Sequence, residues 1–509
     1  MKNILLLMTD QQRADQRGLG GFDTPNLDAL ARRANFDCRT VDPICTPARS
    51  ALLTGRYPRQ VGMITMSGDL DHQIPTMPQA LQKAGYTTYG VGKFHFLQTW
   101  PWGTGRGEGW DFIKNQAEMK KFGFDFVWET AGKQQQLQNY DHYCAHLDEK
   151  GLLEEYRDFI LESGGANGDT ADHNYDKTLP FPFHEADYVD AVTGRIACER
   201  LEAHPSDRPF YMFVSFCGPH KPYDPPARYM DMFPIERRDD FILEPGQQLS
   251  ENQKEALYRQ RRAAKAMLKL IDDQTGRILS VLERRGMLQD TLIAFTSDHG
   301  DMLGDHFLIQ KGVPWKQATR VPLYISLPGA RDAGETGALA ELTDLTATIL
   351  DFAGLDPESA LSRPWPAYNA RIPCRSLLPV LRGAEESVRD FAFCECDFTE
   401  ERVGVRCAYT RAEYQQIRGA GRDTAWQMIE SPTHKYVKYL GYDAPGAYHE
   451  ELYNLMTDPD ERRNAARDPA EREALQEARD RLMYVMDAYP PAQKTWTDSR
   501  LNETRHNGG

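Results

Sequence analysis

The sequence has few cysteines, and they follow no disulfide or metal-binding pattern. Nine cysteines are scattered irregularly over 509 residues, and no two of them form a C-x-x-C pair. An odd number at irregular spacing argues against a disulfide framework. Cys394 and Cys396 are separated by one residue, but a zinc site normally needs four converging ligands, so we interpret both as buried thiols.

The sequence also lacks a long hydrophobic run at its start and an excess of positive charge. The first apolar run covers residues 4–8 and is followed directly by Thr9 and Asp10, so it is too short for a signal peptide or a membrane span. Asp and Glu number 75 against 60 Lys and Arg, giving a formal charge of −15. This balance argues against nucleic acid and anionic membranes as partners. We expect a cytoplasmic protein that begins at Met1.

Short apolar runs that end in polar residues recur along the first part of the chain. Four of them, expected to be strands, cover residues 3–9, 86–91, 210–216 and 291–296. Helical patterns lie between them, at residues 25–34, 77–84, 185–203 and 252–285. Near-continuous apolar strands that alternate with helices predict an α/β fold with a mostly parallel central sheet covered by helices on both faces.

The pattern changes after about residue 370. Residues 391–416 and 425–439 are expected to form strands with polar turns, and residues 471–489 an amphipathic helix. We therefore predict a catalytic α/β domain at 1–372, a C-terminal α+β subdomain with a small antiparallel sheet and a packed helix at 373–489, and a polar tail at 490–509. The aromatic-rich stretch 97–183 either caps a substrate site or packs into the core.

Chemically active side chains follow each of the four predicted strands. Ligands of parallel sheets bind beyond the carboxyl ends of the strands, so residues at those ends should converge. The residues in question are Asp10 and Gln11 after the first strand, Lys93 and His95 after the second, His220 after the third, and Asp298 and His299 after the fourth. Lys93 and His95, two residues apart, would face the same side of an extended segment.

A short helix with strong boundary signals is expected after Cys45. Thr46 is suited to the N-cap, Pro47 to the first helical position and Gly55 to the position past the end. Cys45 would then lie at the positive end of the helix dipole, with Arg49 one turn further in. Taken alone, such a cysteine is more commonly a small buried thiol.

The segment Cys45-x-Pro47-x-Arg49, followed by Leu53-Thr54-Gly55-Arg56, resembles the signature of the sulfatases, a family of the alkaline phosphatase superfamily. Further matches occur in the same order over residues 1–470: Thr24-Pro25-Asn26-Leu27, Gly92-Lys93-Phe94-His95, Pro219-His220-Lys221-Pro222, Ser297-Asp298-His299-Gly300-Asp301, Lys311, and Glu451-Leu452-Tyr453-Asn454-Leu455 with Asp458-Pro459. The family fold, an α/β sandwich with a small C-terminal sheet, agrees with the predicted one.

The resemblance implies a set of roles. In sulfatases the cysteine is oxidised to formylglycine, here at Cys45, by a maturation enzyme that would be a partner of this chain. The implied metal ligands are Asp10, Gln11, Cys45, Asp298 and His299, and the implied catalytic residues are Cys45, Arg49, Lys93, His95, His220 and Lys311. The family ion is usually calcium. Gln11 and His299 resemble the choline-sulfatase and phosphonate monoester hydrolase branches, so manganese stays an alternative.

The resemblance predicts hydrolysis of a sulfate ester, with two alternatives. One is a phosphonate monoester or phosphodiester hydrolase with the same nucleophile, although Lys93-x-His95 replaces the hydroxyl residues of that branch. The other is a non-catalytic anion-binding protein in which Cys45 is never converted. Some relatives carry an asparagine about 20 residues after the nucleophile; here Thr65 or Ser67 would take its place. The sequence leaves the alcohol half of the substrate and homo-oligomerisation open.

Overall fold

The computed structural model describes residues 2–15, 22–66, 68–97, 105–163, 177–362, 371–397, 425–440 and 449–492. Its main feature is a nine-stranded sheet with the order β4-β3-β5-β1-β6-β8-β2-β7, in which β9 also pairs with β2. The strands are β1 (Asn3–Asp10), β2 (Asn35–Arg39), β3 (Thr87–Lys93), β4 (Phe126–Thr130), β5 (Phe210–Pro219), β6 (Thr291–Ser297), β7 (Arg320–Val321), β8 (Leu323–Ser326) and β9 (Glu335–Glu341). The four predicted strands are confirmed as β1, β3, β5 and β6.

The centre of this sheet is parallel. β1 pairs in parallel with β5 on one side and β6 on the other, and β3 joins β5 and β4 in the same direction. Antiparallel pairing is confined to β7 and β8, which pair with β2, and to the β6–β8 edge of the parallel part. The carboxyl ends of β1, β3, β5 and β6 therefore lie next to one another along one side of the sheet.

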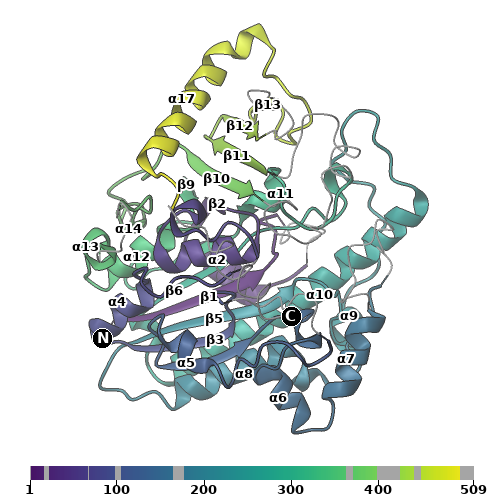
Figure 1. Ribbon diagram of the computed structural model, residues 1–509, viewed down its shortest axis with the longest axis vertical. Helices are drawn as coiled ribbons and strands as arrows, with labels where there is room; N and C mark the ends of the chain where they lie inside the picture. Colours follow the sequence, from purple (N-terminus) through teal and green to yellow (C-terminus); the bar gives the residue numbers. More distant parts are fainter. Residues whose placement is uncertain are drawn as a thin grey trace, which may run out of the picture.

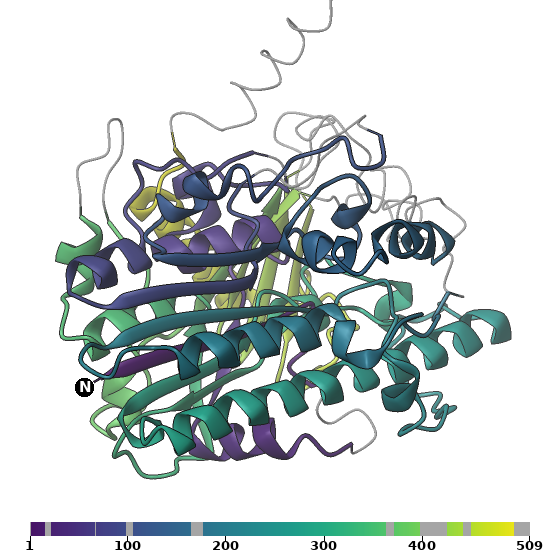
Figure 2. The ribbon, with the colours of Figure 1, turned by 90° about the horizontal axis from the view of Figure 1, so that it is seen from below.

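Helices cover both faces of the sheet (Figure 1 and Figure 2). β1 is buried throughout, and its successive side chains enter two different cores. Leu6 and its neighbours on one face pack with α2 (Cys45–Thr54), α4 (Met77–Lys83) and α12 (Asp344–Phe352). Leu5 and Leu7 face the opposite core, with α1 (Pro25–Arg33), α8 (Val189–Glu202) and α10 (Glu251–Arg284). This confirms the predicted two-faced α/β architecture.

The C-terminal part is a separate four-stranded antiparallel sheet with a helix on it (Figure 1). Its strands are β10 (Ala392–Asp397), β11 (Ala425–Glu430), β12 (His434–Tyr439) and β13 (His449–Asn454), and α17 (Arg472–Ala488) packs on β11 and β12. The predicted strand at 391–416 is described only as far as residue 397, and most of the tail at 490–509 lies outside the described residues. The domain boundary at 372/373 stays a prediction.

Many aromatics of the stretch 97–183 that the structure describes contribute to the core, while Trp110 is half-buried. Phe122 and Phe124 belong to one core of the sheet, and Trp128 and Tyr143 to the other. Trp100 and Trp102 lie outside the described residues. The segment forms α5 (Gln116–Lys120), β4, α6 (His142–Asp148) and α7 (Leu153–Glu162). Packing is therefore the role of these core aromatics.

The remaining short elements connect these layers. They are α3 (Pro58–Val61), α9 (Ala227–Met230), α11 (Lys316–Thr319), α13 (Pro357–Leu361), α14 (Leu378–Leu381) and the 3₁₀ turns Gln135–Leu137, Glu185–Asp187, Leu288–Asp290, Asp305–Phe307 and Pro469–Glu471. Cys394 and Cys396 are buried, as expected. Among the described residues, no helix combines the length and apolar character needed to cross a membrane.

Candidate active site

The helix that carries Cys45 begins earlier than the sequence predicts. α2 starts at Cys45 itself, with extended Ile44 as its N-cap, so the assignment of Thr46 to the N-cap is wrong. The backbone provides the cap: the Ala48 amide already donates to the Ile44 carbonyl over 3.0 Å, and no side chain is needed. Gly55 ends the helix in the left-handed region at φ 66°, as predicted. Cys45 thus lies in the first turn, at the positive end of the helix.

Four potential metal ligands converge on this helix end. Asp10, Cys45, Asp298 and His299 are buried, and their ligand atoms all lie within 4.8 Å of one another. The Nε2 atom of His299 lies 3.3 Å from the Cys45 sulfur. Asp10 and Asp298 come from the ends of the neighbouring strands β1 and β6, which explains why residues so distant in sequence meet.

Two buried oxygen atoms at this point have no hydrogen-bond partner. They are Oδ1 of Asp10 and Oε1 of Gln11, and both residues are fully buried. Buried polar atoms are normally paired, since an unpaired one costs about 1–3 kcal/mol. Carboxylate and amide oxygens with one imidazole suit a hard divalent cation such as Ca²⁺ or Mn²⁺. The donor set therefore fits the implied ion.

Arg49 holds the two carboxylates in place. Its Nε donates to Oδ2 of Asp298 over 2.7 Å, and its guanidinium also donates to Oδ2 of Asp10 over 3.3 Å and to the Ser215 hydroxyl over 2.7 Å. The guanidinium donates these hydrogen bonds to the metal-ligand candidates and to Ser215. Arg49 therefore acts on Cys45 through its positive charge. Lys93 at the end of β3 pairs with the same Asp10 oxygen.

The cations dominate the electrostatics of the site. Burial and the charge of Asp10 raise the pKa of the Cys45 thiol, but Lys311, Lys93 and His299 outweigh them and hold it well below its usual value. Lys311 reaches the sulfur directly, at 2.9 Å. Burial also raises the pKa of Asp10, yet Lys93 and the other cations lower it well below the ordinary range. The site therefore stabilises negative charge at position 45 and at Asp10.

His95 faces Cys45, but not through an extended backbone. Lys93 is the last residue of β3, whereas His95 adopts a left-handed conformation with φ 58°, so the expected extended segment is wrong beyond Lys93. Nε2 of His95 lies 2.7 Å from the Ala131 carbonyl and must donate to it, because a carbonyl only accepts. In the neutral ring the other nitrogen, Nδ1, then carries no proton, and this buried atom has no hydrogen-bond partner. The His95 side chain also interacts with Cys45. Burial and Lys93 lower the His95 pKa.

His220 is fixed by the same kind of contact. Its Nδ1 donates to the Lys221 carbonyl over 2.7 Å, which leaves Nε2 for the site. Burial, followed by the charge of Lys311, lowers the His220 pKa well below its usual value. His220 and Lys311 are 8% and 9% exposed, the most accessible of the predicted site residues, so they border the entrance of the site.

The structure adds residues that the sequence did not assign. Ser215 holds Arg49 from within the apolar run of β5, where nothing marks it in the sequence. Asp301 accepts hydrogen bonds from the Gln11 amide and the Tyr223 hydroxyl. Asp301 is the last residue of Ser297-Asp298-His299-Gly300-Asp301, one of the segments that resemble the sulfatases, so the sequence did point to it. Of the two proposed substitutes for asparagine, Thr65 is buried and Ser67 lies outside the described residues.

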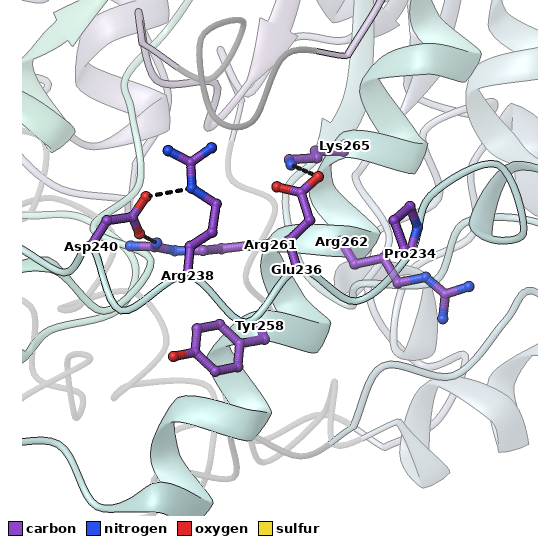
Figure 3. Close-up of a pocket in the computed structure, with 8 residues that line it drawn as sticks. All are labelled: Pro234, Glu236, Arg238, Asp240, Tyr258, Arg261, Arg262 and Lys265. Carbon is purple, nitrogen blue, oxygen red and sulfur yellow. Dashed lines mark hydrogen bonds and ion pairs between the residues drawn. The ribbon is translucent and has the colours of Figure 1, made fainter.

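A second charged pocket lies on α10 and the segment before it (Figure 3). Its basic side chains form ion pairs with neighbouring carboxylates. It is lined by Pro234, Glu236, Arg238, Asp240, Tyr258, Arg261, Arg262 and Lys265. Asp240 pairs with Arg238 and Arg261, and Glu236 pairs with Lys265. Arg261 also donates to the Leu303 carbonyl over 3.1 Å, so this cluster supports the loop that follows His299.

Comparisons with known proteins agree with this geometry. The profile of the Sulfatase family matches residues 2–355. An arylsulfatase of Clostridium perfringens is 30% identical over 395 residues, 70% of this chain and 76% of that protein. A choline-sulfatase of Rhizobium meliloti is 28% identical over 489 residues, 92% of this chain and 83% of that protein. The solved phosphonate monoester hydrolase of Agrobacterium radiobacter superposes with a TM-score of 0.71 at 23% identity, covering 96% of both chains. The chain therefore belongs to the sulfatase family of sulfuric ester hydrolases.

Proposed function

We propose that this chain hydrolyses a sulfate ester to an alcohol and sulfate through a formylglycine made from Cys45, with one divalent cation held beside it. The observation that carries the proposal is the convergence of Cys45 with Asp10, Asp298 and His299. Asp10 and its neighbour Gln11 each carry a buried oxygen without a hydrogen-bond partner, and buried cations surround the group. A simple buried thiol would not lie against a lysine and a histidine, and would not have its pKa lowered.

The ion would be held by Asp10, Gln11, Asp298, His299 and residue 45. When bound there, it would supply Lewis-acid stabilisation of negative charge on the nucleophile and on the transferred group. Three of the four side chains other than residue 45 offer oxygen, which favours Ca²⁺, while the imidazole keeps Mn²⁺ an alternative.

In the first step, the sulfur of Cys45 marks the position of one hydroxyl of the hydrated formylglycine. This hydroxyl first loses its proton to solvent, and its oxygen then attacks the sulfur of the ester, so that a new S–O bond forms and the bond from sulfur to the alcohol oxygen breaks. Lys93 and Lys311 hold the charge of the sulfuryl group. His220, together with Lys311, is the proposed proton donor to the departing alcohol oxygen. Because the His220 pKa is depressed, the His220 ring must take up a proton when the anionic ester binds.

In the second step, His95 removes the proton of the remaining hydroxyl. The aldehyde then re-forms, the bond between carbon and the sulfate oxygen breaks, and sulfate leaves. The geometry suits this role, since Nδ1 is kept unprotonated by the bond from Nε2 to the Ala131 carbonyl. A serine or cysteine at position 45 could be sulfated but has no second hydroxyl, so it could not expel the group.

Mass spectrometry of the peptide that contains Cys45 tests the proposal, because conversion to the aldehyde changes its mass. It should be combined with an assay of sulfate release from a nitrophenyl sulfate. We expect converted protein that releases sulfate. Unconverted, inactive protein with a bound anion would support the non-catalytic alternative, and faster cleavage of a phosphonate monoester than of the sulfate ester would support the phosphonate hydrolase alternative.

A further inference from the structure

The carboxylate of Asp301, three residues after the metal-ligand candidate Asp298, is buried and fully hydrogen-bonded. Its Oδ1 accepts the backbone N–H groups of Leu303 and Gln310, over 3.2 and 2.8 Å. Its Oδ2 accepts the side-chain amide of Gln11 over 2.6 Å and the Tyr223 hydroxyl over 2.5 Å. Asp301 is 2% exposed. None of the steps described above uses it.

The contact with Gln11 determines which end of that amide faces the site. A glutamine amide is nearly symmetrical in shape, and either its oxygen or its nitrogen can point in a given direction. An ionised carboxylate only accepts hydrogen bonds, so the Gln11 nitrogen must face Asp301 and the oxygen must face away. That oxygen is the buried atom without a partner beside Asp10. A cation can be bound by the oxygen and not by the N–H₂ group.

We propose that Asp301 is a positioning residue that selects the metal-binding orientation of Gln11. Tyr223 donates to the same carboxylate oxygen and links it to the loop that carries His220. The backbone of Gln11 supports the same geometry: its N–H donates to Oδ1 of Asp298 over 3.1 Å, at a φ of 69° that a non-glycine residue rarely adopts. This inference rests on the proposed metal site.

The substitution Asp301→Asn tests the proposal because the backbone dictates how the new amide lies. Two N–H groups point at the Oδ1 position, so the new side chain keeps its oxygen there and turns its N–H₂ group toward Gln11. Gln11 must then rotate to accept, which presents its nitrogen to the ion. We expect binding of Ca²⁺ and Mn²⁺ to weaken about tenfold or more, as measured by calorimetry on chelator-stripped full-length protein.

The second substitution, Gln11→Glu, should reverse the effect only in the Asp301→Asn background. There a carboxylate at position 11 accepts from the new amide and still offers an oxygen to the ion, so affinity should return to within about threefold of wild type. Alone, Gln11→Glu sets two carboxylates against each other, which forces one to take up a proton, and affinity should not exceed that of wild type. Asp305→Asn removes a carboxylate from the same loop and controls for charge.

The outcomes separate this inference from the proposed function. Wild-type protein that binds neither ion would reject the metal site itself. Wild-type binding with unchanged affinity in Asp301→Asn, or an equal loss in Asp305→Asn, would reject only the positioning role, as would Gln11→Glu that binds more tightly by itself. If Asp301→Asn is too unstable to titrate, the double variant decides: metal binding close to wild type supports the proposal, and failure to fold or bind overturns it.

Discussion

The ammonium group of Lys311 donates a hydrogen bond to the sulfur of Cys45 over 2.9 Å. Nε2 of His299 lies 3.3 Å from the same sulfur. The atom at position 45 therefore lies close to both the Lys311 ammonium group and a metal-ligand candidate, in a position that stabilises an anion. In the converted enzyme, a hydroxyl oxygen of the hydrate would take this place, and its ionisation would be favoured for the same electrostatic reason.

Replacing Cys45 with serine should convert the enzyme into a single-turnover reagent. Serine can accept the sulfuryl group but cannot expel it, so we expect no more than about one equivalent of alcohol per protein and no sulfate release. Rapid-quench measurement of the alcohol, with intact-protein mass spectrometry for the sulfated species, checks this. Cys45→Ala should release nothing, while Cys198→Ala, on the half-buried face of α8, should behave as wild type. Sustained turnover by Cys45→Ser would reject formylglycine chemistry.

Replacing Asp298 with asparagine should remove the ion as well as activity. The change takes a carboxylate from the donor set and removes the charged partner to which Arg49 Nε donates over 2.7 Å. We expect metal affinity to fall on the order of 100-fold, measured as bound metal per protein after dialysis. Asp344→Asn is a matched control, since Asp344 is equally buried and also pairs with an arginine, Arg389, but belongs to α12 and not to the candidate metal site. Stoichiometric metal in Asp298→Asn would show that it is not a ligand.

Much of the site could be predicted because it depends on strand ends. Apolar runs fix β1, β3, β5 and β6, and parallel pairing then brings Asp10 and Asp298 together without further information. The family resemblance supplied Lys311, which lies in a loop and follows no strand.

What the sequence could not supply depends on the backbone path within loops. His95 adopts a left-handed conformation, in which its ring Nε2 donates a hydrogen bond to the Ala131 carbonyl in the segment after β4. Ser215 is one polar residue in an apolar strand, and its meaning appears only once α2 places Arg49 against it. The start of α2 was misjudged because Thr46 is a good N-cap by type, whereas the Ile44 carbonyl already accepts the first helical bond.

The pH dependence of kcat/KM should differ from that of kcat. The pKa of His220 is lowered below its ordinary 6.5. A proton donor reacts only in its protonated form, and kcat/KM follows the pKa of the free enzyme, so kcat/KM for an alkyl sulfate should fall as the pH rises through that lowered pKa. The pKa of His95 is also lowered, and a base must be unprotonated, so kcat should fall only as the pH drops below it when the second step limits. Rate profiles with buffers of constant ionic strength measure both. A kcat/KM that rises with pH across this range contradicts the assignment of His220.

A buried ion cluster should make the two sheets unfold together. Glu430 at the end of β11 accepts from Arg39 of β2 over 2.6 Å and lies 3.0 Å from Lys435 of β12. Burial raises the Glu430 pKa, but Arg39 and Lys435 outweigh it and lower it. Glu430→Gln removes the carboxylate that Arg39 and Lys435 share, and leaves Arg39 only its pair with Asp37 and Lys435 only its pair with Glu461. It should therefore cost about 2 kcal/mol of unfolding free energy, measured by urea denaturation, because charged hydrogen bonds between the two sheets are lost. Glu199→Gln, which breaks an exposed pair with Arg195, should cost less than about 1 kcal/mol. Equal effects would show that the cluster does not join the sheets.

The two histidines should respond differently to the leaving group. A proton donor contributes in proportion to the negative charge that develops on the departing oxygen, so His220→Ala should lower kcat/KM about 100-fold or more for an alkyl or sugar sulfate and clearly less for a nitrophenyl sulfate. His95→Ala acts after the alcohol has left, and it should therefore accumulate a sulfated protein with either substrate, visible by mass spectrometry under turnover. His184→Ala, at an exposed histidine before α8, serves as the control for both. Equal losses for good and poor leaving groups in His220→Ala would reject its role as the donor. A leaving-group-dependent loss confined to His95→Ala would mean that the two roles are exchanged, because only the residue that protonates the alcohol can sense how strongly that alcohol needs a proton.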